Sequence, residues 1–173
     1  MIGAQLAVEL VNLRRTDAWS VTTVEAALAR GLVRFDHLDE ETLCGVARVA
    51  DQLGSIFGAD GIPERCKRIN GLLAGAVQRV HLALHDDLPP HLHFAGLESG
   101  LIQRVLAATT GGLVIFAVES GGERMGTCAR SECGRVFLDT SKNGRRTYCS
   151  AQCGNTEAVR RYRKEASASA AGS

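Results

Sequence analysis

Four cysteines near the C-terminus have a spacing typical of metal ligands. Cys128 and Cys133 form one close pair, and Cys149 and Cys153 form a second pair after fifteen intervening residues. Two such pairs can complete a tetrahedral thiolate shell around Zn²⁺, which leaves no coordination position for water or substrate. We therefore expect one structural zinc ion as the cofactor. The spacing alone leaves two alternatives open, an iron–sulfur cluster and four unrelated thiols.

Short elements must hold these cysteines in place. Residues 136–138 and 147–148 are expected to form two strands, joined by a loop that contains the turn dipeptide Asn143-Gly144. Cys149 is expected just before a helix and Cys153 in its first turn. Together these elements would form a small treble-clef-like zinc-finger domain. A module of about 40 residues buries too little apolar surface to fold alone, so the metal would supply its stability.

Positive charge is concentrated in the same segment. Residues 1–123 hold ten lysines and arginines against fifteen acidic residues, whereas residues 124–165 hold ten against four. Basic residues crowd the predicted loop and the predicted last helix, where they could contact the phosphates of double-stranded DNA. The alternative is a solvated helix end whose cations suit its dipole. The candidate DNA-binding residues are Lys142, Asn143, Arg145, Arg146, Arg160, Arg161, Arg163 and Lys164.

The first 120 residues are expected to be mainly helical, with few short strands, because apolar residues recur at intervals of three and four. Leu6, Leu10 and Leu13 share one helical face. Thr22 and Glu25 suggest a capping box, and Asp39 can cap the next helix. The expected elements are helices over 22–30, 39–57 and 63–84, a short strand over 91–94 and a helix from 101, with 113–118 either helical or a buried strand.

The chain divides where its charge balance changes sign. We expect a helical domain over residues 1–120, a linker over 121–123 around Gly121-Gly122, a zinc finger over 124–165 and a disordered tail over 166–173. Neither a membrane span nor a secretory signal is expected, which indicates a cytoplasmic protein. Cys44 and Cys66, outside the quartet, are expected to be buried thiols.

Histidines offer a weaker indication of a second site. His81 and His85 are four apart on a predicted helix, and imidazoles at that spacing could bind a metal ion or an anionic ligand. Surface histidines near a helix end are the plainer interpretation. No pairing of a nucleophile with a base supports catalysis, so we do not expect an enzyme.

Residues 128–163 resemble the CGNR zinc-finger family of bacterial proteins. The resemblance rests on the paired cysteines and on the segments VFLDTSKNGRR, YCSAQCGN and VRRYR. The opening LAVELVNLRR is similar to the start of the ABATE domain that precedes the finger in this family. The resemblance implies a stress-induced transcription regulator whose finger binds DNA and whose N-terminal domain senses a ligand. It also carries the zinc-ligand role onto Cys128, Cys133, Cys149 and Cys153. Thr156 departs from the pattern, because the family has arginine there.

Two partner hypotheses follow. In the first, a homodimer formed through the helical domain places two fingers on double-stranded DNA, and a small-molecule effector acts on the helical domain. In the second, the finger binds RNA or another protein, since small zinc modules serve all three roles. Preference for one duplex sequence over random duplex and over single-stranded RNA distinguishes them.

Overall fold

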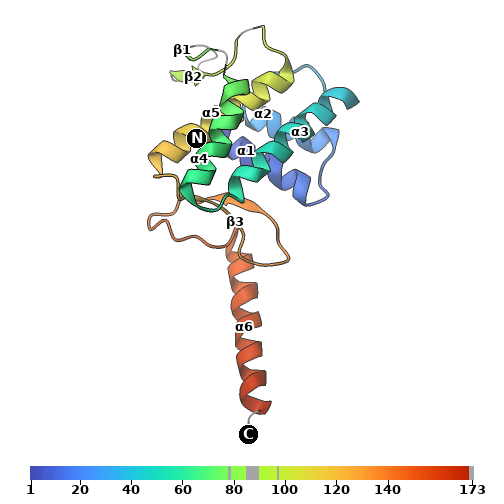
Figure 1. Cartoon of the computed structure of the whole chain (residues 1–173). Coiled ribbons are helices and arrows are strands. Elements are labelled where there is room, and N and C mark those ends of the chain that lie inside the picture. Colours follow the sequence, from blue (N-terminus) through green and yellow to red (C-terminus); the bar gives the residue numbers. More distant parts are fainter. Residues whose placement is uncertain (78, 85–89, 97, 172–173) are drawn as a thin grey trace.

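The structure, a computed structural model, describes residues 1–77, 79–84, 90–96 and 98–171. The described residues are mainly helical and form two small antiparallel sheets, as Figure 1 shows. In chain order the elements are α1 (Ile2–Arg15), α2 (Val21–Arg30), α3 (Glu40–Phe57), α4 (Gly61–Ala76), β1 (His81–Ala83), β2 (His91–His93), α5 (Leu101–Glu119), β3 (Met125–Thr127), β4 (Val136–Leu138) and α6 (Ala151–Ala171).

Helix α1 lies at the centre of the helical part and contacts α5, α3 and α2. Leu6 and Leu10 are buried on the face predicted from their spacing. Helices α1 and α5 approach very closely where Gly3 and Gly112 meet. A Cβ atom at Gly112 would lie 2.3 Å from the backbone nitrogen of Ala4, so only glycine permits this crossing.

The first helices begin close to their predicted positions. Asp39 caps α3 as predicted, because its carboxylate accepts a hydrogen bond of 2.8 Å from the backbone N–H of Thr42. The capping box of α2 is formed by Ser20 and Thr23, and the predicted box at Thr22 and Glu25 is wrong by two residues. Cys44 and Cys66 are exposed, contrary to prediction, because they lie on the outward faces of α3 and α4.

The third predicted helix ends earlier than its apolar pattern suggests. Helix α4 stops at Ala76, and Val77 takes an extended conformation. Residues 81–83 then pair with residues 91–93 as an antiparallel ribbon, in which His81 lies opposite His93. Apolar residues continue at helical spacing beyond Ala76, but strand pairing overrides that local pattern. The strand expected over 91–94 is present as β2.

Helix α5 is long and apolar enough to cross a membrane by length and composition. Within the structure it packs against α1, α4 and α3. Val105, Leu113 and Phe116 lie in the shared hydrophobic core. Residues 113–118 are helical rather than a strand, because α5 continues to Glu119.

Gly121 and Gly122, expected to lie in a linker over 121–123, follow Ser120 in the C-terminal cap of α5. Gly121 and Gly122 have positive φ angles, and the N–H of Gly122 donates to the carbonyl of Ala117 over 2.8 Å. This is the hydrogen bond of a Schellman cap. The buried Arg65 of α4 donates to the carbonyl of Gly122. The chain is therefore fixed to the helical part at the point where the finger begins.

Helix α6 projects away from the rest of the molecule as a single rod (Figure 1). It continues to Ala171, whereas the sequence predicts a disordered tail from residue 166. Alanine has the highest helix propensity, and alternating alanine and serine can extend a helix that is already nucleated.

Candidate metal centre

The finger begins with a hairpin that differs from the predicted one. Strand β3 pairs with β4, and Met125 lies opposite Leu138. The predicted partner, residues 147–148, is not a strand. Thr147 instead accepts one hydrogen bond, of 2.9 Å, from the backbone N–H of Ala129. The loop between β3 and β4 carries the first cysteine pair, Cys128 and Cys133.

The second cysteine pair is positioned by the start of α6. Ser150 precedes the helix, and its hydroxyl accepts a hydrogen bond of 3.2 Å from the backbone N–H of Cys153. This is an N-cap contact, and it places Cys149 just before the helix and Cys153 in its first turn, as predicted. Thr156, at the position of the family arginine, donates its hydroxyl to the carbonyl of Gln152 on its own helix.

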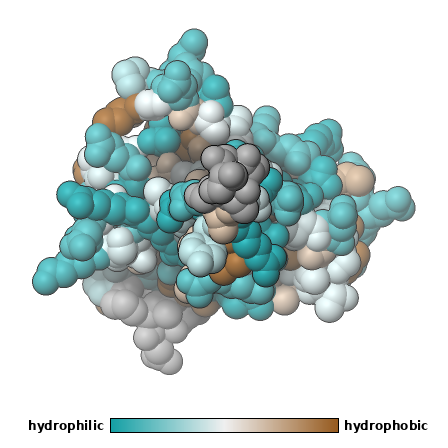
Figure 2. Space-filling view, turned by 90° about the horizontal axis from the view of Figure 1, so that it is seen from below, coloured by the Kyte–Doolittle hydropathy of each residue, from teal (hydrophilic) through white to brown (hydrophobic). Residues whose placement is uncertain are grey.

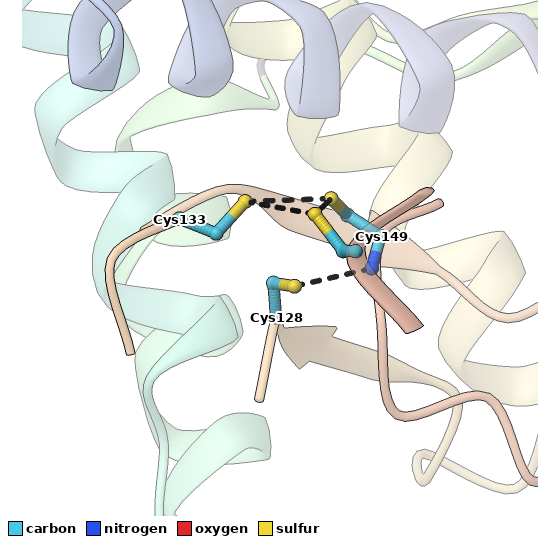
Figure 3. A group of neighbouring side chains, drawn as sticks. Cys128, Cys133 and Cys149 are labelled. Atoms are coloured by element: carbon cyan, nitrogen blue, oxygen red, sulfur yellow. Dashed lines mark hydrogen bonds between the residues drawn. The ribbon is translucent and has the colours of Figure 1, made fainter. Parts of the chain in front are cut away.

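The four sulfur atoms converge on one point (Figure 3). All of them lie within 4.8 Å of one another. The sulfur of Cys133 is 3.5 Å from that of Cys149 and 3.7 Å from that of Cys153, and the last two are 3.6 Å apart. A tetrahedral ion with Zn–S bonds of about 2.3 Å holds its sulfurs about 3.8 Å apart. The cluster therefore has the dimensions of a zinc thiolate site.

Surrounding groups shift the pKa values of two of the thiols in opposite directions. Burial raises the pKa of Cys149 to about 12, and hydrogen bonds with the neighbouring thiols add to this. A hydrogen bond with Ser150 lowers the pKa of Cys153 to about 6. The backbone N–H of Cys149 donates to the sulfur of Cys128 over 3.4 Å. Because a metal binds thiolates, filling the site releases protons, and metal affinity must fall as the pH falls.

Asp139 organises the basic loop and was not among the predicted site residues. It is 2% exposed, and its carboxylate accepts hydrogen bonds from the N–H of Ser141, the hydroxyl of Ser141 and the N–H of Arg146. Desolvation alone would raise its pKa, but these hydrogen bonds and the charge of Arg124 hold it below its ordinary value. The sequence Asp-Thr-Ser, typical of a turn, was the available signal.

Two side chains of α1 attach the finger to the helical part. The side-chain amide of Asn12 donates to the carbonyl of Val136 over 3.0 Å and accepts from its N–H over 2.8 Å. Arg15 donates to the carbonyl of Gly134 in the finger and to that of Gly54 in α3. Met125, Val136 and Leu138 also belong to the hydrophobic core of the helices. The finger is thus packed onto the helical part.

The predicted DNA-binding residues are all exposed, but two of them have structural contacts. The guanidinium group of Arg146 donates to the carbonyls of Tyr148 and Cys149 and lies over the ring of Phe137. Arg160 donates to Ser131 over 3.2 Å. The others lie in the loop (Lys142, Asn143, Arg145) and on α6 (Arg161, Arg163, Lys164). The face of the molecule from which α6 projects is mainly hydrophilic (Figure 2).

One of the two predicted histidines, His81, does not lie on a helix. His81 lies in β1, and His85 lies outside the described residues. The helical spacing on which their pairing was predicted is therefore absent at His81.

Comparison with known proteins agrees with the geometry of the finger. The family model described as the CGNR zinc finger matches residues 124–166. No curated protein matches the chain. The family match and the convergence of four sulfurs support the same conclusion. Cys128, Cys133, Cys149 and Cys153 form the binding site of one structural zinc ion.

Proposed function

We propose that this protein is a zinc-dependent, DNA-binding transcription regulator of the cytoplasm, and not an enzyme. The observation that carries the proposal is a metal-held unit with seven basic side chains on one loop and one projecting helix. Helix α6 has 21 residues and a length of about 31 Å. A helix of this kind fits the major groove of B-DNA, where cations set affinity and a few side chains read base edges.

The principal test is selection of bound duplexes from a random pool, with intact protein and with Cys149→Ser. Intact protein should enrich one sequence motif, and the variant should enrich none. A pool of single-stranded RNA serves as the competing substrate, since preference for it would favour the RNA-binding alternative. Enrichment of nothing by either protein would contradict the DNA-binding proposal.

A charge-matched comparison then locates the contact surface. The triple variant Arg161→Ala, Arg163→Ala, Lys164→Ala removes three cations from α6. The control Arg48→Ala, Lys67→Ala, Arg79→Ala removes three exposed cations from the helical part. Each lost phosphate contact should reduce the slope of log affinity against log salt by about 0.9. We expect a shallower slope for the first variant and an unchanged slope for the control.

The helical part is proposed to act as the ABATE-like sensor and as the homodimer surface. An open cleft of about 570 Å³ lies between α1 and the finger, lined in part by Glu9, Asn12, Arg135 and Arg146. A small-molecule effector bound there would touch both parts of the chain. Thr140→Trp places a bulky group in this cleft, and a change in DNA affinity would support coupling between the cleft and the finger. Sedimentation of the intact protein tests the dimer.

A further inference from the structure

The ribbon of β1 and β2 has an unusual distribution of side chains. Leu82 and Leu92, which lie opposite each other, are 68% and 45% exposed. On the other face His81, His91 and His93 are half-buried. A ribbon packed only for stability would turn its leucines inward and its imidazoles toward water. Functional or strained sites are the places where such local rules are expected to be broken.

The strand register brings three imidazoles together. His81 and His93 are cross-strand partners, and His91 and His93 are two residues apart and so project from the same face. The Nε2 atoms of His91 and His93 are 3.0 Å apart and share a hydrogen bond. The ring centroids of His81 and His93 are 5.2 Å apart. Two nitrogens therefore already converge, and a change in the side-chain torsions of His81 would bring in the third.

An unsatisfied atom provides an independent indication. The Nδ1 atom of His81 is buried and has no hydrogen-bond partner among the described residues. A buried polar atom without a partner is costly, and buried polar groups are normally satisfied. Coordination of a metal ion would satisfy such a nitrogen.

We propose that His81, His91 and His93 form a second metal site, which binds a late first-row divalent ion such as Zn²⁺, Ni²⁺ or Co²⁺ through imidazole nitrogens. Imidazole suits these ions, and three histidines leave a coordination position open for water or another ligand. The ribbon lies at the opposite end of the molecule from α6 (Figure 1). This site is separate from the cysteine cluster in both position and ligand chemistry.

The test uses the full chain with its finger loaded with zinc, and Co²⁺ as the probe. Cobalt bound to imidazole gives visible ligand-field absorption without the near-ultraviolet charge-transfer band of cobalt thiolates. We expect one additional Co²⁺ per chain, with retention of the zinc. The matched control is His37→Ala, which removes a histidine outside the ribbon and should leave cobalt binding unchanged.

Removal of the ligands should abolish the second site. The double variant His91→Ala, His93→Ala should bind no additional cobalt, and His81→Ala should bind it at least about tenfold more weakly. His93→Cys should retain cobalt binding and add a thiolate charge-transfer band, which keeps the proposal testable if the double variant does not fold. Circular dichroism and zinc content verify folding of each variant. Absence of additional cobalt in the intact protein, or its undiminished binding by the double variant, would overturn the proposal.

Discussion

The helical part and the finger are held together by different forces. In the helices, leucine, valine and isoleucine side chains form one buried core, and hydrophobic burial of this kind is non-directional. In the finger, strands of three residues and one turn of helix place four sulfurs around a point. The finger therefore depends on a few directional bonds in addition to its contacts with the core, whereas the helical part depends on many weak contacts.

The largest expected effect is that of Cys149→Ser, which should unfold the finger and leave the helical part folded. We expect zinc content to fall from one ion per chain to none, because three thiolates do not complete the site. Structural zinc contributes on the order of 10 kcal/mol to folding of small fingers. Elemental analysis and limited proteolysis should show a metal-free, cleavable segment after residue 124, with α1 to α5 still protected. Cys66→Ser, at an exposed cysteine outside the cluster, should retain the zinc. Loss of the helices as well would show that the two regions unfold as one.

Leu53→Ala tests the other side of the comparison. Leu53 is fully buried in α3, and truncation of such a leucine destabilises a protein by about 3 kcal/mol. Urea unfolding followed by circular dichroism should show this loss. Zinc content in native buffer should stay at one ion per chain. The control is Leu82→Ala. It removes the same side-chain atoms at an exposed position. A zinc-free Leu53→Ala protein would contradict independent stabilisation.

Asn12→Ala addresses the junction between the regions. The variant leaves both the N–H and the carbonyl of Val136 without their present partner, at a cost of about 2 kcal/mol. We expect faster removal of zinc by a chelator, because the finger detaches more easily. Asn70→Ala, at an exposed position of α4, should leave the rate unchanged. Equal rates for all three proteins would mean that the junction contributes nothing to metal retention.

Asp39→Asn should have the smallest effect, visible only in acid. Hydrogen bonds from the side chain and backbone of Thr42 lower the pKa of Asp39 in the folded state. A lowered pKa contributes stability above the unfolded value of about 3.9, and this stability is lost as the pH falls through the folded value. The intact protein should therefore lose stability faster than Asp39→Asn below about pH 4. Thermal unfolding across this range, monitored by helix content, measures the difference. Parallel curves would show that the charge at this cap is irrelevant.

The sequence predicted the parts whose signals are local. Ligand spacing identified the four cysteines, and the interval of four residues between Cys149 and Cys153 placed this pair correctly at the start of α6. Strand β3 escaped prediction because Met-Gly-Thr is too short to show a period. The end of α4 at Ala76 depends on the pairing of the following residues 81–83 with residues eight to twelve positions further along the chain.

Other features depend on contacts that no local pattern specifies. Gly112 looks like a break in a helix, yet it permits the close crossing with α1. Gly121 and Gly122 look like a flexible connection, yet they cap α5, and the carbonyl of Gly122 accepts a hydrogen bond from Arg65. The histidine cluster needs the antiparallel register of β1 and β2, which places residues 81 and 93 side by side.

The projecting α6 has a consequence for how the zinc site acts at a distance. The first turns of this helix are anchored through Cys153 and through the contact of Arg160 with Ser131. Because α6 is long, a small rotation at its start displaces its far end by a larger distance. A small change in the angle of one metal–sulfur bond would therefore move the basic side chains of α6. The coordination geometry of a single ion therefore sets the direction in which α6 projects.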